Sequence, residues 1–196
     1  MVSRLYSKSF ILHKMLTNAF NRRAVRASLL VFACGALFTG STSFCFRHSF
    51  NNYSIVIDKS DYELNVYDSK GWLIAYPVVF GSNDQHDKFW EGDRRTPDGH
   101  FRIVSKRVHE KWDRFMMLDY PTPENIALFN ARKSRGLIPA SARIGGGIGI
   151  HGTWPHEDYA IDRYQNWTMG CISMKNEDVE ALYRYIPVGT SVTIQP

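Results

Sequence analysis

The chain has 196 residues, of which 44% are hydrophobic and 14% aromatic, so it can bury the core of one domain and carry a short extension. Its formal net charge is +5, but much of this excess precedes the first acidic residue, at Arg4, Lys8, Lys14, Arg22, Arg23 and Arg26. The rest is nearly balanced and contains no nucleic-acid motif, so the charge is poor support for a nucleic-acid-binding protein.

An uncharged stretch from Ala27 to Phe46 follows the basic residues. A basic flank before an apolar run of about twenty residues is typical of a secretory signal or an N-terminal membrane anchor. We therefore expect residues 1–50 to direct export and residues 51–196 to form a folded domain in the cell envelope or periplasm, either anchored in the inner membrane or released by cleavage. A buried N-terminal helix of a cytosolic protein is the alternative. Cys34 lacks the context of a lipoprotein acylation site, because Phe32 lies two positions before it.

Two segments with an apolar residue at every second position open the folded part. Ile55 and Ile57, then Leu64 and Val66, alternate with polar neighbours. This period predicts strands with one buried face. The run Asp68–Gly71 predicts the turn of a hairpin, because glycine supplies the left-handed backbone conformation.

Further strands are expected along the middle of the chain, separated by a polar loop. The apolar segments lie at Trp72 to Phe80, at Phe101 to Ser105 and from Arg114 onwards, and Ser82 to Gly99 is rich in turn residues. Short connections between many strands favour a mainly β protein with short helices (α+β), built as a mixed β-sandwich or barrel.

Two helices are expected. Pro123 to Arg135 begins with proline and is followed by Gly136; a lid over a site and a structural cover for the sheet are both open for it. Asn176 to Ile186 starts with acidic residues, and Asn176 is expected to cap it. The buried stripe of this second helix is expected to consist of Val179, Leu182, Tyr183 and Ile186.

The reactive residues of the chain are concentrated near its end. His151 lies on a glycine-punctuated apolar run that predicts the end of a strand, and Cys171 lies between Gly170 and Ile172. An ordinary thiol has a pKa of about 8.5, so a neighbouring imidazole that takes the proton and stabilises the thiolate as an ion pair makes it a nucleophile near neutral pH. Glycine before the cysteine leaves room for backbone amides to face a substrate oxygen. These features predict cysteine acyl transfer.

Two alternatives to a catalytic pair remain. An isolated cysteine is often an inert apolar residue of the core, and an isolated histidine is often structural. A zinc site of His151, His156 and Cys171 is possible by ligand type, but no metal-binding spacing such as a Cys-x-x-Cys pair accompanies it.

The segment Ile150-His-Gly-Thr153, followed by Thr168-Met-Gly-Cys-Ile172, resembles the motif of the YkuD-type L,D-transpeptidases. The resemblance runs from about Tyr53 to the end of the chain. Further matching segments are Tyr53–Asp58, Tyr62–Tyr67, Thr96–Ile103, Asn176–Tyr183 and Val188–Ile194. Many family members carry arginine two residues after the cysteine and histidine two residues before it, where this chain has Ser173 and Met169.

The resemblance implies that residues 51–196 are a catalytic domain that acts on the peptide stems of peptidoglycan. It implies Cys171 as nucleophile, His151 as general base and acid, and the backbone carbonyl of Gly152 as the group that orients the imidazole. Thr168, Gly170 and Ser173 are the expected residues around the oxyanion and the substrate. No cofactor or metal is expected, and carbapenem β-lactams are expected to acylate the cysteine.

The implied reaction is an acyl transfer from a tetrapeptide stem to an amine, which is a second stem or a lysine of an envelope protein. A thiol hydrolase that uses water instead, such as an L,D-carboxypeptidase or an enzyme acting on peptidoglycan–protein links, is the alternative, and Ser173 in place of arginine is the departure that keeps it open. A peptidoglycan-binding module without activity is a third class, which the presence of both His151 and Cys171 disfavours.

Overall fold

The computed structural model describes residues 52–196. The predictions for the export segment therefore lie outside the described residues. Among residues 52–196, no helix has the length and apolar character needed to cross a membrane.

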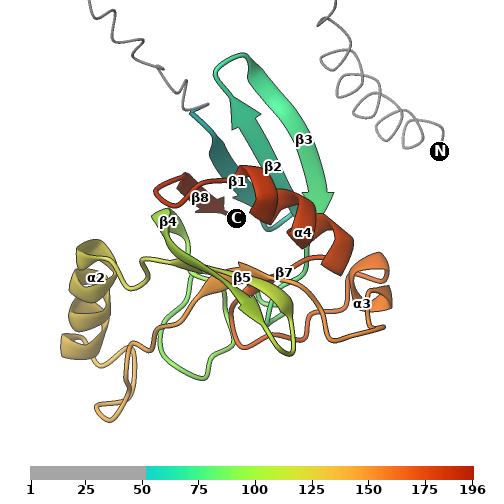
Figure 1. Cartoon of the computed structure of the whole chain (residues 1–196). Coiled ribbons are helices and arrows are strands. Elements are labelled where there is room, and N and C mark those ends of the chain that lie inside the picture. Colours follow the sequence, from blue (N-terminus) through green and yellow to red (C-terminus); the bar gives the residue numbers. More distant parts are fainter. Residues whose placement is uncertain (1–51) are drawn as a thin grey trace, which may run out of the picture. The chain divides into compact units, whose positions relative to one another are not determined.

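The strands of the described chain form one mixed β-sheet of eight strands, which confirms the mainly β fold class with short helices (Figure 1). The strand order is β3-β2-β1-β8-β4-β5-β6-β7. The β1–β8 and β6–β7 pairs are parallel and the other pairs are antiparallel. The strands are β1 (Ser54–Asp58), β2 (Glu63–Asp68), β3 (Gly71–Pro77), β4 (Gly99–His109), β5 (Asp113–Leu118), β6 (Gly149–His151), β7 (Ile172–Ser173) and β8 (Ser191–Gln195).

Alternating apolar residues fix the first strands as the sequence predicts. Ile55, Ile57, Leu64 and Val66 are all buried, and β1 pairs with β2 in antiparallel register. The third strand is shorter than predicted, because β3 ends at Pro77. Beyond it the chain makes one isolated bridge from Val79 to Ser173, which brings this segment to the edge of β7.

The described helices are α2 (Pro123–Ser134), α3 (Tyr159–Asp162) and α4 (Asn176–Tyr185). α4 packs against β5 and β6, with Val179, Leu182 and Ile186 buried and Tyr183 partly buried. The prediction that Asn176 caps α4 is wrong. Lys175 is the N-cap residue and its side chain makes no capping hydrogen bond. The Asn176 side chain bonds to Thr153 instead of to the helix end.

Two features of the middle of the chain differ from expectation. β4 continues to His109 instead of ending at Ser105, and it forms a long hairpin with β5. The short helix α3 has no counterpart among the predicted elements. The long hairpin matters for the site, because its turn carries Trp112 next to β6.

The polar loop from Ser82 to Asp98 is ordered around a buried ion pair. Asp93 accepts hydrogen bonds from Lys88 Nζ at 2.7 Å and from the backbone N–H groups of Phe89, Trp90 and Arg95. Arg132 of α2 holds this loop from the other side, bonding the carbonyl of Lys88 at 2.8 Å and the carboxylate of Asp87 at 2.7 Å. α2 is therefore fastened to the loop that runs toward the cysteine.

Candidate active site

The parallel pairing of β6 with β7 brings His151 and Cys171 to one face of the sheet. Ile150 pairs with Ile172 and His151 pairs with Ser173, so Cys171 precedes β7 and lies beside Gly149. Side chains two positions apart on a strand point to the same face. The His151 side chain is 1% exposed, whereas Cys171 is partly exposed and is the free cysteine of the described residues. The Cys171 Sγ contacts the carbonyl oxygen of Gly147 at 3.5 Å.

The imidazole of His151 is oriented by the residue that follows it. His151 Nδ1 lies 2.7 Å from the carbonyl oxygen of Gly152. A carbonyl oxygen only accepts hydrogen bonds, so Nδ1 carries the proton in the neutral ring. Nε2 is then the basic nitrogen, and it has no hydrogen-bond partner among residues 52–196. This tautomer is the one that a general base needs.

Ser173 shares the acceptor of His151. Its hydroxyl donates to the same Gly152 carbonyl at 3.2 Å, and its side chain is completely buried. The hydroxyl is thus engaged inside the fold, next to the imidazole's own acceptor. The expectation that Ser173 contacts the substrate is therefore corrected: this side chain supports the carbonyl that orients the base.

Three further residues fix the turn after His151. The Thr153 N–H donates to Asn176 Oδ1 at 3.0 Å, and Asn176 Nδ2 donates back to Thr153 Oγ1 at 3.1 Å. Asp158 accepts from Thr153 Oγ1 at 2.6 Å and from the Asn176 N–H at 3.1 Å. Gly152 leaves space for this arrangement, since a Cβ atom there would lie 2.2 Å from Asn176 Oδ1. We call Thr153, Asp158 and Asn176 the turn network.

Aromatic rings surround the imidazole. Trp112 stacks on His151 with ring centroids 4.7 Å apart, Phe115 lies parallel to it at 5.9 Å, and Trp167 meets it edge-on at 5.6 Å. Burial among these rings lowers the pKa of His151 to about 4, although the hydrogen bond to Gly152 acts in the opposite direction. The ring is therefore neutral at physiological pH.

The thiol is also held neutral. Burial raises the pKa of Cys171, while a hydrogen bond from Gly149 and the charge of Lys88 partly oppose this increase. Since both shifts favour uncharged forms, the resting pair is a thiol and a neutral imidazole. Both pKa shifts therefore favour the uncharged pair over the thiolate–imidazolium ion pair expected from the sequence.

The loop before the cysteine is folded by Thr168. Its Oγ1 donates to the Cys171 carbonyl at 2.8 Å and accepts from the Gly170 N–H at 3.1 Å, and its side chain is buried. The Gly170 N–H is thus occupied, which corrects the expectation that it faces the substrate oxygen, and Thr168 shapes the loop rather than contacting substrate. The Cys171 N–H has no acceptor among residues 52–196 and is the amide at this position that can donate to an oxyanion.

Glycines allow the loop to lie close to its neighbours. A Cβ atom on Gly81 would lie 2.3 Å from the Arg94 carbonyl and 2.6 Å from the Gly170 nitrogen. Gly170 has a φ of +124°, and a Cβ atom there would lie 2.7 Å from the Arg95 carbonyl. The segments around Gly81 and Arg95 therefore lie in close backbone contact with the loop before Cys171.

The zinc alternative finds no geometric support. No group of three or more His, Cys, Asp or Glu side chains within residues 52–196 is placed to hold a metal ion. His156 is exposed and lies in the loop between Thr153 and Asp158, and it does not join His151 and Cys171 in a ligand set.

Sequence reasoning missed Trp112, Trp167 and the turn network. Asn176 and Asp158 carry no local signal beyond the preference of Asn and Asp for caps and turns. Trp112 reaches His151 only because β5 pairs with β6, a contact between distant parts of the chain. A tryptophan at the turn of an alternating hairpin was the one available signal for it.

Comparison with known proteins gives one family. Residues 52–194 match the family model described as YkuD, the L,D-transpeptidase catalytic domain. A search of curated proteins gives no match.

Among solved structures, the helical cell shape determining protein Pgp2 from Campylobacter jejuni aligns with a TM-score of 0.55 and 23% identity, over 75% of this chain and 48% of its own. Bd1075 from Bdellovibrio bacteriovorus aligns with a TM-score of 0.52 and 20% identity, over 74% of this chain and 48% of its own. The chain thus spans about half the length of these two structures, and the likeness shows a shared fold.

Proposed function

Because this chain belongs to the YkuD family of L,D-transpeptidase catalytic domains, we propose that it is a peptidoglycan L,D-transpeptidase with Cys171 as its nucleophile. The observation that carries the proposal is the His151 imidazole, whose Nδ1 is 2.7 Å from the Gly152 carbonyl, so that Nε2 is the basic nitrogen. The β6–β7 register puts His151 and Cys171 on one face of the sheet. A cysteine beside a fixed, neutral base is the arrangement that nucleophilic acyl transfer requires.

In the first step, Cys171 Sγ attacks the carbonyl carbon of the third residue of a tetrapeptide stem. His151 Nε2 takes the thiol proton as the C–S bond forms, which suits a resting pair in which both groups are uncharged. The Cys171 N–H donates to the oxygen that gains negative charge. The imidazolium then returns the proton to the nitrogen of the terminal D-alanine as the C–N bond breaks, leaving a thioester.

In the second step, an amine attacks the thioester carbonyl and His151 Nε2 accepts a proton from it. The C–S bond breaks, an amide forms and the sulfur regains its proton. The acceptor is the amine of a second stem or of a lysine on an envelope protein.

A hydrolase that delivers water to the same thioester is the second candidate, and Ser173 is the observation that favours it. The position where many relatives carry arginine is here a fully buried serine, so no cation acts there on the substrate. The two candidates share the first step and differ only in the acceptor.

Mass spectrometry of products from tetrapeptide muropeptides tests the proposal. Cross-linked dimers are the expected products, and they require an intact Cys171. Tripeptides alone would show that the enzyme is a hydrolase and not a transferase. Unchanged substrate would support a binding module without activity. Cys171→Ala is the control: it removes one sulfur atom, so it should fold normally and form no product.

We also propose that the enzyme works in the cell envelope, where peptidoglycan lies, after export by its N-terminal segment. The support is the basic, then uncharged sequence before residue 51. A reporter that is active only outside the cytoplasm, fused after Phe50, should be active. The same reporter fused to a chain with charged residues inserted between Ala27 and Phe46 should be inactive, and equal activity of the two would contradict export.

A further inference from the structure

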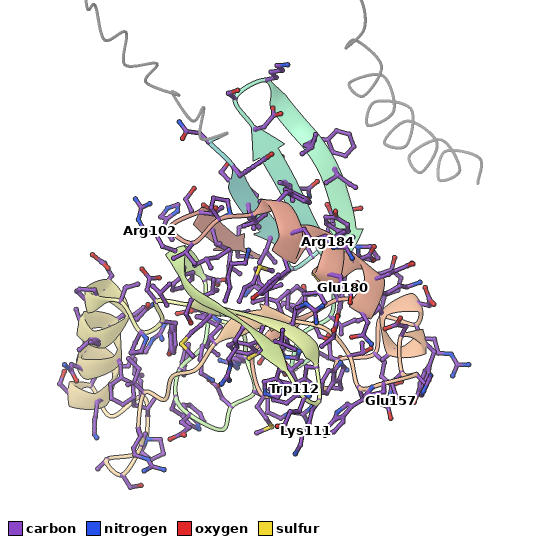
Figure 2. The ribbon with its side chains drawn as sticks, in the orientation of Figure 1. Arg102, Lys111, Trp112, Glu157, Glu180 and Arg184 are labelled. Carbon is purple, nitrogen blue, oxygen red and sulfur yellow. The ribbon has the colours of Figure 1, made fainter. Side chains whose placement is uncertain are left out.

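A cavity lies at the turn of the β4–β5 hairpin, and Trp112, an aromatic neighbour of the catalytic imidazole, is one of its lining residues. It has a volume of about 470 Å³, and Arg107, His109, Lys111, Trp112 and Trp154 are among its lining residues. Trp112 joins it to the site, because one indole stacks on both His109, at 4.3 Å, and His151, at 4.7 Å. Figure 2 shows Lys111 and Trp112 together at this end of the hairpin.

Two cations of this cavity are unpaired. Arg107 and Lys111 are exposed, and neither forms an ion pair with a carboxylate among residues 52–196. Arg95, Arg114 and Arg132 elsewhere in the domain do have acidic partners, so the cations of the cavity differ from these three. Glu110 is the one acidic residue that lines the cavity, so the cations outnumber it.

Each of these two cations lies over an aromatic ring. Lys111 Nζ lies 5.5 Å above the ring of Trp154, and Arg107 Cζ lies 5.2 Å above the ring of Phe115. Trp154 is 37% exposed and meets Trp112 edge-on at 6.4 Å. A ligand that suits this lining has a negative group for the cations and an apolar portion that lies on the indole of Trp154.

We propose that this cavity, the Trp112–Trp154 pocket, binds a carboxylate-bearing part of the peptide substrate while the substrate reacts at Cys171. The inference rests on the proposed function, which makes the substrate a peptide with free carboxylates. The buried Ser173 supplies no cation for these carboxylates, so the pocket provides cations for them at another position. Arg107 and Lys111 are then specificity-determining residues that act next to the base.

Binding measured by calorimetry tests the pocket apart from chemistry. The full-length chain with Cys171→Ala is titrated with a tetrapeptide muropeptide and with its amidated form, in which carboxamides replace the free carboxylates. Adding Arg107→Gln and Lys111→Gln should weaken binding of the carboxylate form about tenfold, as expected for two solvent-exposed ion pairs. It should leave binding of the amidated form unchanged. Trp154→Ala should weaken binding of both forms.

The matched control is Lys70→Gln with Arg135→Gln, which removes the same charge from two exposed residues outside the pocket. This control should bind both peptides as the parent does, and a tenfold loss with it would overturn the pocket. An equal loss for both peptide forms, or no binding of the peptide, would also overturn it. Displacement of the peptide by inorganic polyphosphate at lower concentration than by free muropeptide would overturn it too, because it would assign the cations to a phosphate polymer. If binding behaves as expected while the wild-type enzyme yields no product, the proposed transferase activity fails and the pocket stands.

Discussion

His151 combines deep burial with one free ring nitrogen. Three aromatic residues remove water from the imidazole, and the Gly152 carbonyl fixes which nitrogen carries its proton. A histidine in this setting is a weak base that stays uncharged, so it can accept a proton only as the thiol attacks. Catalysis then depends on the geometry of attack more than on a standing population of thiolate.

The first prediction concerns the pH dependence of Cys171 acylation by a carbapenem. The pKa of His151 is lowered from 6.5 to about 4, so the base stays neutral as the pH falls from 7 to 5. The acylation rate should therefore hold nearly constant over that range and fall only near pH 4. Intact-protein mass spectrometry gives the rate, and His151→Ala should reduce it at every pH. A half-maximal rate near pH 6.5 would contradict the burial argument.

The second prediction concerns Ser173. Introducing the family's arginine would place a guanidinium at a fully buried position that holds only a hydroxyl. Burying an unpaired charge is costly, so Ser173→Arg should lower the free energy of unfolding by several kcal/mol. Urea denaturation measures it. Ser173→Ala, which adds no volume, should stay within about 1 kcal/mol of the wild type, and stable folding of Ser173→Arg would show that the side chain can reach solvent.

At the scale of elements, α4 supports catalysis through its first residue. Asn176 begins the helix, yet its side chain does not bond the helix end and joins the turn network beside Gly152. β6, which carries the base, and α4, which follows the nucleophile's strand, are thereby locked together. The position of the base is a property of this junction as much as of β6 alone.

The third prediction tests that junction. Asn176→Ala removes the hydrogen bonds of the side chain to Thr153. It removes no cap from α4, because the Asn176 side chain does not cap this helix. The Gly152 carbonyl should then move, so carbapenem acylation should slow about tenfold at a temperature well below unfolding. Arg184→Ala, at the exposed far end of α4, is the control and should leave the rate unchanged. Equal rates for the two variants would show that the turn network does not position His151.

The sequence predicts those parts of the structure that depend on local patterns. The alternation at Ile55 and Ile57 is a local signal of a strand with one buried face, and the structure confirms it. The pair His151 and Cys171 follows from a motif. Asn176 was misassigned because its preference for a cap is local, whereas its partner Thr153 comes from a different part of the chain. Trp112 was missed for the same reason, since the β5–β6 pairing that brings it to His151 is long-range.

At the scale of the whole domain, the buried imidazole links stability to pH. The unfolded chain binds a proton at His151 below about pH 6.5, whereas the folded domain binds it only near pH 4. Between these values the unfolded state carries more protons, so stability falls as the pH falls. The contribution is fully present above pH 6.5 and is lost progressively down to pH 4.

The fourth prediction follows from this linkage. Urea denaturation at pH 7.5 and pH 4.5 should show a loss of stability in the wild type that exceeds the loss in His151→Gln. The excess should be about 3 kcal/mol, because glutamine does not titrate and the other groups are common to both proteins. Equal losses in the two proteins would mean that the imidazole is protonated inside the folded domain.

The stacking of the imidazole on Trp112 also gives it a distinct magnetic environment. The two rings are nearly parallel, with 24° between their planes and 4.7 Å between their centroids. Protons held over the face of an indole are shielded by its ring current, so the carbon-bound imidazole protons of His151 should resonate upfield of those of an exposed histidine such as His86. Among the seven histidines of the chain, His109 stacks on the same indole at 4.3 Å, so comparison with His109→Gln identifies the signals of His151 in nuclear magnetic resonance spectra. Loss of the upfield shift on adding a muropeptide would report that substrate has parted the two rings.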